Sequence, residues 1–347
     1  MLRFHDSLCR REAAEWMIFM ENLELAISEI KKELPGLALY ENEPMSAHCS
    51  MKVGGPARVF AVPQTLESLT RICCILKDHG HAPYLLGKGT NVVFPDEGVR
   101  DLFVLSTEHL DQLFLLDENR LYAGAGVSLS KLASFAQQNS LAGLEFASGI
   151  PGSVGGGVMM NAGAYGGELK DAVESVVIYY LPEQKLYELS AEQCRFAYRS
   201  SLFQTMFGCV ILSAVFRLEK GGGEEIAAKM RELNNRRRDK QPLDLPSAGS
   251  AFKRPEGHYA AALIEEAGLK GFRVGGAQVS EKHAGFIVNT GSATAKDVYE
   301  LMDQVRKRVY ESSGIALAPE IILLSPDYRL EDKGPKAPRN HIDALSP

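Results

Sequence analysis

The glycines of this sequence are concentrated in one short segment. The chain has 347 residues and 32 glycines, and nine of these lie between Gly143 and Gly167. Glycine at this density indicates backbone with positive φ or backbone that closely approaches another group. A cluster of tight turns or β-bulges would account for it, and so would a cradle of backbone N–H groups around a phosphorylated ligand. The segment is therefore a candidate ligand site.

Two familiar phosphate-binding motifs are absent. The nearest approach to a P-loop is Gly87-Lys88-Gly89-Thr90, where a glycine follows the lysine and none stands at the required upstream position. A dinucleotide fingerprint begins at Gly124-Ala125-Gly126, but Leu129 occupies the place of its third glycine. P-loop phosphoryl transfer and Rossmann-type NAD binding are both disfavoured.

Two glycine-containing loops remain, each after an expected strand. The first extends from Leu85 to Val93, and the second from Ser148 to Gly157, continuing as Asn161-Ala162-Gly163-Ala164-Tyr165-Gly166. Together they could present successive backbone N–H groups to a pyrophosphate without a metal ion.

The composition narrows the class of protein. Hydrophobic residues make up 45% and charged residues 24%, the balance of a globular chain. Lys and Arg number 38 against 44 Asp and Glu, which argues against the broad positive face of a nucleic-acid-binding protein.

No apolar run approaches the roughly 20 residues of a membrane helix. The six cysteines lack disulfide or CxxC spacing, so we expect a cytoplasmic protein. His79 and His81 have no second ligand pair, so no metal is expected.

Periodicity and breakers divide the chain into blocks of mixed α+β structure. We expect an N-terminal extension at 1–19, blocks at 20–86, 87–220 and 221–326, and a flexible tail at 327–347, with a hinge-like joint at Gly221-Gly222-Gly223. Expected helices begin near Glu21, Leu66, Ser128 and Ile226, and a fifth, capped by Thr294 and Asp297, carries Val298 to Val309. Expected strands are Ala57–Val62, Val173–Tyr180, Val210–Leu218, His283–Asn289 and Glu320–Leu324.

A longer series of motifs resembles the UDP-N-acetylenolpyruvoylglucosamine reductase family. Besides the two loops, it comprises Met51-Lys52-Val53-Gly54-Gly55-Pro56-Ala57, Ala197-Tyr198-Arg199-Ser200-Ser201, Ala248-Gly249-Ser250-Ala251-Phe252-Lys253 and Ala318-Pro319-Glu320. The match extends from about Met20 to Leu324. The resemblance implies an FAD-binding domain of the vanillyl-alcohol-oxidase type in two subdomains, here 20–86 and 87–220, and a C-terminal α+β substrate domain.

The resemblance also implies a reaction. NADPH, a co-substrate, reduces non-covalently bound FAD and leaves. The enolpyruvyl ether of UDP-N-acetylglucosamine then takes a hydride from flavin N5 and a proton from the protein, which gives UDP-N-acetylmuramate for peptidoglycan. No nucleic acid or membrane is implied as a partner, and we expect a monomer.

Three residues match the catalytic positions of that family. Ser250 matches the proton donor, and Arg199 and Glu320 match the pair that stabilises charge developing on the substrate carboxylate. The fork of an arginine binds carboxylates in a bidentate manner. A glutamate beside an anionic substrate should be protonated or bridged by a cation, with a raised pKa. Without the resemblance, Ser250 would be read as a turn serine and Arg199 as half of a surface ion pair.

The resemblance assigns the ligand contacts as well. The cofactor-binding positions are Gly87, Lys88, Gly89, Thr90, Asn91, Gly124, Ile150, Pro151, Gly152, Ser153, Gly155, Gly156, Gly163 and Ala164. The substrate-binding positions are Tyr198, Arg236, Lys240 and His283. As a substrate ligand, Lys240 is favoured over the arginines at 236–238. The alternative for all four residues is that they only form a solvated basic helix end.

The sequence departs from one branch of the family. That branch has an extra loop, carrying a tyrosine, in the segment after Arg199, where this chain has no room for one. Arg254 also replaces an asparagine of that branch, and His283 replaces a glutamine. The chain therefore resembles the shorter type. Two alternatives to the reductase remain, a flavin-dependent oxidase of alcohols or lactones on the same FAD domain and a non-catalytic nucleotide-sugar binder.

Overall fold

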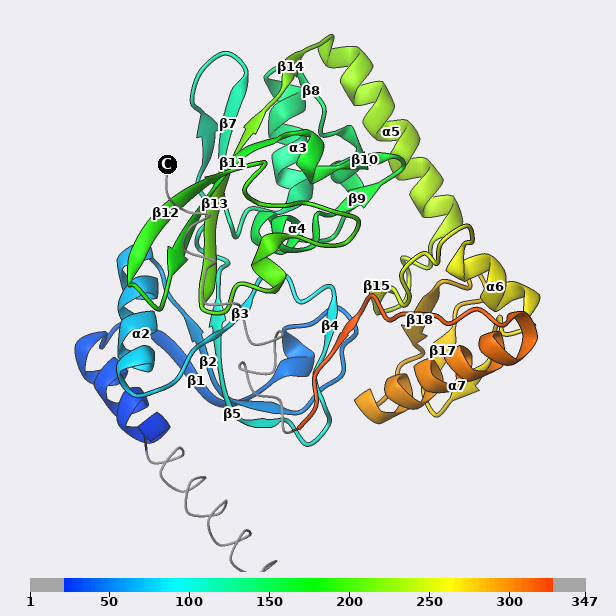
Figure 1. Cartoon of the computed structure of the whole chain (residues 1–347), viewed down its shortest axis with the longest axis horizontal. Coiled ribbons are helices and arrows are strands. Elements are labelled where there is room, and N and C mark those ends of the chain that lie inside the picture. The colour runs from blue at the N-terminus through cyan, green and yellow to red at the C-terminus, as the bar shows by residue number, and fades with distance from the viewer. Residues whose placement is uncertain (1–21, 327–347) are drawn as a thin grey trace, which may run out of the picture.

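The computed structural model describes residues 22–326, which form three packed parts (Figure 1). The extension predicted at 1–19 and the tail predicted at 327–347 lie outside these residues. None of the helices in the described range is long and apolar enough to cross a bilayer.

The first part is a mixed four-stranded sheet with helices on one face. Residues 22–33 are helical, and the elements that follow are β1 Ala38–Pro44, η1 Met45–Ala47, β2 Pro56–Val62, α2 Leu66–Asp78, β3 Tyr84–Leu86, β4 Val92–Val93 and β5 Val99–Ser106. The strand order is β1-β2-β5-β3, with β1 antiparallel to β2 and the other pairs parallel. Helix α2 ends before Gly80, whose φ of 78° makes it the expected closing glycine. The first glycine loop leaves the sheet at the C-terminal end of β3.

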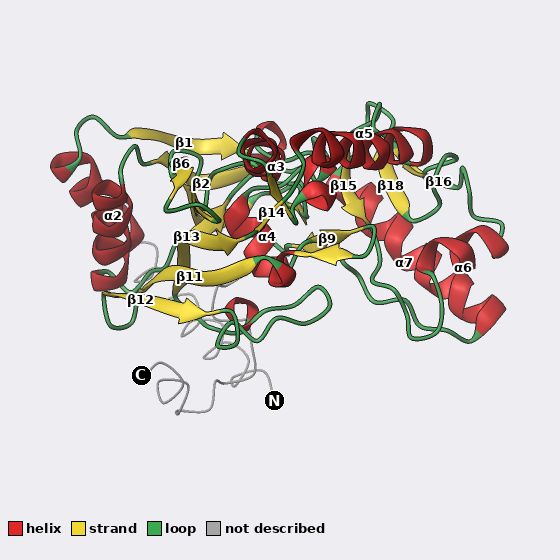
Figure 2. Ribbon diagram, turned by 90° about the horizontal axis from the view of Figure 1, so that it is seen from above, coloured by secondary structure: helices red, strands yellow, loops and turns green. Residues whose placement is uncertain are grey.

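The second part is an antiparallel five-stranded sheet covered by short helices. Its elements are β6 Leu113–Leu115, β7 Arg120–Gly124, α3 Leu129–Gln138, β8 Leu141–Ala142, η2 Glu145–Gly149, α4 Val154–Met160, β9 Gly163–Ala164, β10 Gly167–Glu168, η3 Leu169–Asp171, β11 Val173–Tyr180, β12 Lys185–Ser190, η4 Leu202–Gln204, β13 Cys209–Arg217 and β14 Glu219–Lys220. The strand order is β12-β11-β13-β7-β6. Figure 2 shows α2 on one side of β13 and α4 on the other, and the core beneath α2 includes Tyr179 and Leu212 of this sheet. The first two parts therefore share a core.

The third part is a small antiparallel sheet backed by helices. It follows α5 Gly223–Lys240, and its elements are β15 Ser247–Ser250, α6 Ala260–Glu266, β16 Arg273–Val274, β17 Ala277–Val279, β18 Phe286–Asn289, α7 Ala295–Ser313 and β19 Ile322–Leu323, with strand order β15-β18-β17-β16. The capping box predicted for Thr294 and Asp297 is confirmed. The strand predicted from His283 begins only at Phe286, because the Phe286 N–H bonds the His283 carbonyl in a turn. The strand predicted at Glu320–Leu324 is reduced to two residues.

Helix α5 packs differently from the block that the sequence suggested for it. Leu233, on its inner face, belongs to the core of the second part, together with residues of α3 and β13. The core of the third part is formed by other residues, among them Ala248, Val279, Val298 and Leu301. The change from one core to the next thus comes after α5 rather than at the glycine triplet, and the boundary at 220/221 and the hinge there remain predictions.

The third part is fastened to the first by the returning end of the chain. Strand β19 pairs in parallel with β4, with Ile322 opposite Val92, and this segment crosses between the two parts in Figure 1. The Asp96 carboxylate also accepts the N–H groups of Ala295 and Lys296 at the start of α7. This pairing brings Glu320, just before β19, next to the first glycine loop.

Candidate active site

One cavity, of about 360 Å³, lies where the three parts meet. Its lining includes most of the site residues expected from the sequence: Gly87, Lys88, Gly89, Thr90, Asn91, Ile150, Pro151, Gly152, Ser153, Gly156, Gly163, Ala164, Arg199, Ser250 and Glu320. Segments far apart in the sequence thus converge on a single site. No group of three or more metal-binding side chains occurs in residues 22–326.

The first glycine loop lines this cavity and contains a run of N–H groups that have no acceptor in residues 22–326. The N–H groups of residues 87–91 donate to no residue that the structure describes, whereas the Gly89 and Asn91 carbonyls accept from Ser50 and Ile322. Gly89 has a φ of 60°, and a Cβ there would lie 2.1 Å from the His48 carbonyl oxygen. The loop is therefore held by its carbonyls, and successive N–H groups remain available for an anion.

The second glycine loop uses its N–H groups within the protein. Gly152, Val154 and Gly155 donate to the carbonyls of Ile150, Val127 and Ala125, and the Gly156 N–H donates to the Ser153 hydroxyl. This corrects the expectation that both loops present successive N–H groups. The second loop instead builds the start of α4 and packs closely against the first, since a Cβ on Gly87 would lie 2.2 Å from Ser153 Oγ.

Gly124 and Gly155 do not line the cavity. A Cβ on Gly124 would lie 2.2 Å from the Leu110 carbonyl oxygen, and one on Gly155 would lie 2.9 Å from the Ala125 Cβ. Both glycines allow close backbone packing behind the cavity wall. Their assignment to cofactor binding remains a prediction.

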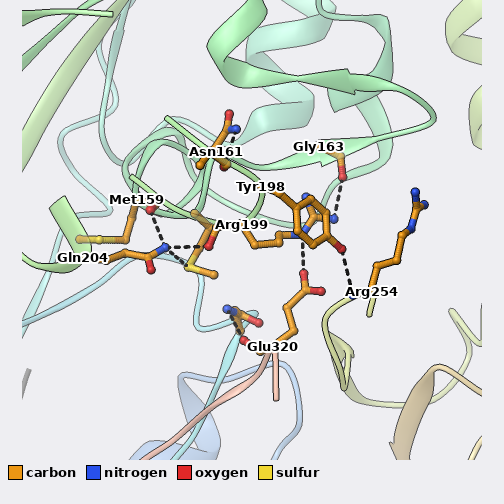
Figure 3. A network of polar contacts seen from close by, with 11 residues as sticks. Met159, Asn161, Gly163, Tyr198, Arg199, Gln204, Arg254 and Glu320 are labelled. Carbon is orange, nitrogen blue, oxygen red and sulfur yellow. Dashed lines mark hydrogen bonds and ion pairs between the residues drawn. The ribbon is translucent and has the colours of Figure 1, made fainter. Parts of the chain in front are cut away.

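Arg199 and Glu320 form an ion pair in the lining of the cavity. The Arg199 guanidinium donates from Nε to Glu320 Oε1 at 2.6 Å and from Nη2 to the Gly163 carbonyl at 3.1 Å (Figure 3). Burial raises the pKa of Glu320, and the opposing effect of Arg199 does not cancel it. The direction agrees with the raised pKa expected for this carboxyl.

Ser250 lies at the end of β15, opposite Phe286 of β18. Ser250 is a lining residue of the cavity, and its hydroxyl makes no hydrogen bond to any residue between 22 and 326. Strand β15 is held against the first part because the Ser50 hydroxyl donates to the Ser247 carbonyl at 2.6 Å. The fold thus places a residue with an unengaged hydroxyl at the cavity, on a strand that is held in place.

The four residues expected to bind substrate lie around the cavity rather than in its wall. The exposed Tyr198 accepts the Arg254 N–H through its hydroxyl and has Arg199 over its ring. Arg236 lies over the Tyr165 ring, and Lys240 is exposed at the end of α5. His283 accepts the Gly285 N–H, and burial lowers its pKa. Their role in substrate binding remains a prediction.

Arg237 and Gln241 are cavity-lining residues that the sequence reasoning missed. Burial lowers the pKa of Arg237, and within the described residues its guanidinium has no ion-pair partner. Gln241 Oε1 is buried without a hydrogen-bond partner. Helical spacing could have found Arg237, because the inward series Ile226, Met230, Leu233 continues to position 237 rather than 236.

Comparisons with known proteins agree with this arrangement. A family model described as the C-terminal domain of UDP-N-acetylenolpyruvoylglucosamine reductase matches residues 241–324, and one described as an FAD binding domain matches residues 57–187. The predicted fold class, an FAD-binding domain followed by a mixed α/β C-terminal domain, is confirmed.

Relatives that bear this enzyme's name match nearly end to end. The chain is 47% identical over 299 residues to UDP-N-acetylenolpyruvoylglucosamine reductase of Caldanaerobacter subterraneus, covering 86% of this chain and 97% of that protein. It is 48% identical to the Pseudothermotoga lettingae enzyme, covering 81% and 95%. The crystal structure of the Thermus caldophilus enzyme superimposes with a TM-score of 0.70 at 35% identity, covering 83% of this chain and 99% of that one. At this identity and coverage, the chain belongs to the UDP-N-acetylenolpyruvoylglucosamine reductase family.

Proposed function

We propose that the protein reduces UDP-N-acetylglucosamine enolpyruvate to UDP-N-acetylmuramate with NADPH and bound FAD, a step of peptidoglycan biosynthesis. The observation that carries this proposal is the convergence of Arg199, Glu320 and Ser250 on the cavity that also receives the free N–H groups of residues 87–91. The free N–H groups suit the phosphates of a bound dinucleotide. The arginine, the neighbouring acid and the free hydroxyl suit an enolpyruvyl substrate with a carboxylate.

The cavity fits the phosphates of FAD. Five successive N–H groups at 87–91 would hold the pyrophosphate without a metal ion, and the unpaired Arg237 guanidinium would supply positive charge near it. Neither glycine loop contains a histidine, in keeping with a non-covalent cofactor. When bound, FAD would supply the chemistry of hydride transfer from NADPH to the substrate.

The opposite side of the cavity suits the enolpyruvyl group. The Arg199 fork would bind the substrate carboxylate, and charge would build up on this carboxylate as C3 gains a hydride. Glu320, with its raised pKa, would be protonated there and so would not repel the carboxylate. The Ser250 hydroxyl would then donate its proton to C2, since it has no competing partner among the described residues.

Positive and aromatic side chains near the cavity would take the remaining contacts. We assign Lys240 and Arg236 to the phosphates of the substrate and of NADPH in turn, and Tyr198 and His283 to the rest of the substrate. We also propose a cytoplasmic protein without a nucleic-acid or membrane partner, because the composition is acidic, the cysteines lack disulfide spacing and no long apolar run occurs, and we propose that it is a monomer.

Following flavin absorbance without oxygen tests this function. The protein, reconstituted with FAD, should be bleached by NADPH and should regain the oxidised spectrum when UDP-N-acetylglucosamine enolpyruvate is added. A yellow protein that ignores this substrate and reoxidises quickly in air would instead be an oxidase. Binding of the nucleotide sugar without turnover would indicate a binding protein, and a failure to take up FAD would refute the proposal.

A further inference from the structure

Arg199 has a backbone conformation that an arginine rarely adopts. Its φ is 52°, in the left-handed region, and it is the third residue of a tight turn in which the Ser200 N–H donates to the Ala197 carbonyl at 3.1 Å. A positive φ at this position favours glycine or asparagine. Such strain persists only where the surrounding structure enforces it, and it is most often found at functional sites.

Two side-chain amides bind the turn at the carbonyls of the residues before and after Tyr198. The Gln204 amide donates to the Arg199 carbonyl at 3.0 Å, and the amide of the fully buried Asn161 donates to the Ala197 carbonyl at 3.0 Å (Figure 3). The backbone that carries the guanidinium is therefore fixed independently of the side-chain bond to Glu320.

Both of these side-chain amides are also held at the C-terminal end of α4. Gln204 Nε2 also donates to the Met159 carbonyl at 3.0 Å and contacts Met160 Sδ, and Asn161 caps this helix with a φ of 43°. A carbonyl in the last turn of a helix lacks an intrahelical donor, so Met159 is a natural anchor for Gln204. Because Ser153 of the second glycine loop caps the start of α4, that loop and the Arg199 turn are attached to opposite ends of one helix.

We propose that Gln204 is a positioning residue for the reduction of the substrate. It holds the Arg199 carbonyl against the end of α4, so that the guanidinium stays beside Glu320 where the substrate carboxylate would bind. Nothing in the sequence motifs marks Gln204, which lies outside all of them. The proposal rests on the proposed function and adds a residue to its machinery.

The two half-reactions separate positioning from general support of the fold. The variant Gln204→Met keeps the volume in the cavity wall and removes the donor. We expect reduction of its FAD by NADPH to stay within about twofold of the unmodified protein, and reoxidation by the enolpyruvyl substrate to slow by about tenfold or more, with a raised KM for that substrate.

A neighbouring serine provides the matched control. Ser201 donates its hydroxyl to the same Met159 carbonyl at 2.7 Å but makes no hydrogen bond to Arg199. Ser201→Ala should therefore leave both half-reactions within about twofold of the unmodified protein. Loss of FAD from Gln204→Met, or equal slowing of its two half-reactions, would assign Gln204 a structural role and overturn the proposal.

A double-mutant cycle tests whether Gln204 acts through Arg199. Gln204→Met should slow substrate-driven reoxidation strongly in the unmodified protein and by less than about twofold when Arg199→Ala is already present. Equal slowing in both backgrounds would contradict the proposal. If the unmodified protein itself fails to reoxidise with the substrate, the proposed function is at fault, and that result is distinct from either outcome of the cycle.

Discussion

Arg199 and Glu320 are 121 residues apart in the sequence, yet the guanidinium Nε lies 2.6 Å from a carboxylate oxygen. Neither is on a long regular element. The arginine occupies a strained turn held by α4, and the glutamate precedes a two-residue strand that pairs with β4. Their side chains retain only 20% and 13% of their exposure, so the pair is largely shielded from water.

The raised pKa of Glu320 predicts a pH dependence. The pKa is raised mainly by burial, so the neutral form persists above the ordinary carboxyl range and is lost as pH rises through the raised value. Substrate-driven reoxidation should slow over that same rise in pH. Glu320→Gln, which is neutral at every pH, should lose this dependence, while reduction by NADPH keeps its profile. Stopped-flow traces across the range provide the check, and an unchanged profile in the variant would exclude a role for protonated Glu320.

The same shift has a defined sign for stability. Because the folded-state pKa of Glu320 exceeds the unfolded value, its favourable contribution to folding is complete below the ordinary carboxyl pKa and is lost as pH rises through the folded value. Glu320→Gln should therefore lose less stability than the unmodified protein over that rise. Urea unfolding at a series of pH values measures this difference.

Local patterns in the sequence were enough to predict the regular elements. Strand β11 at Val173–Tyr180 and the cap of α7 at Thr294 appear as predicted, because alternation and capping depend on neighbours a few residues away. The pairing of β19 with β4 has no such signal. It joins residues about 230 apart through two residues in each strand, and it helps to bring Glu320, whose carbonyl accepts the Asn91 side-chain amide, to the first glycine loop.

The motifs predicted which segments contribute to the site, but not which of their residues line the cavity. The motifs included Gly124 and Gly155, which resemble the lining glycines in sequence and yet pack behind the wall. They also favoured Arg236, the residue beside Arg237, because the motif was read without the helical spacing that places Arg237 on the inward face. Gln204 belongs to no motif, since its contribution is to two carbonyls that only the folded chain brings together.

Ser250→Ala should divide the two half-reactions sharply. Reduction of FAD by NADPH needs no proton from Ser250 and should survive, while reoxidation by substrate should fall by about 10²–10⁴-fold, the usual contribution of a positioned proton donor. Ser247→Ala, in the same strand, is the control, because its contact to Ser50 is made by the backbone carbonyl. Single-turnover traces under anaerobic conditions report both steps. Equal loss of both would remove Ser250 as the proton donor.

Gly89→Ala should abolish FAD uptake or folding, whereas Gly80→Ala should be mild. Both glycines have positive φ, 60° and 78°, and so share a cost of about 1–2 kcal/mol for a Cβ in that conformation. Only at Gly89 would the Cβ lie 2.1 Å from a backbone oxygen, that of His48, while Gly80 has no neighbour within 4 Å. Urea unfolding and the FAD absorbance of the purified variants measure the difference. Similar losses in the two would show that φ alone, and not close approach, matters at Gly89.

His283 should make the protein less stable in mild acid. Burial lowers its pKa from 6.5, and the nearby Lys270 and Lys240 act in the same direction. Its contribution is therefore present above the unfolded pKa and is lost as pH falls through the lowered folded value. Between about pH 7.5 and about pH 5.5, His283→Gln should lose less unfolding free energy than the unmodified protein. His258→Gln, at an exposed position, should behave like the unmodified protein. If His283→Gln loses as much unfolding free energy as the unmodified protein, the acid sensitivity does not come from His283.

Arg237→Met should weaken FAD binding, and Arg236→Met should not. The two residues are neighbours on α5, but Arg237 lines the cavity and has no ion-pair partner in the described chain, whereas Arg236 is exposed and lies near Glu232. Loss of a hydrogen bond between charged groups costs about 1.5–3 kcal/mol, which corresponds to a Kd for FAD raised by about 10–100-fold. Titration of the apoprotein with FAD, followed by quenching of flavin fluorescence, gives both constants. If the two variants bind FAD equally well, the charge that opposes the phosphates is not that of Arg237, and the basic end of α5 serves another ligand.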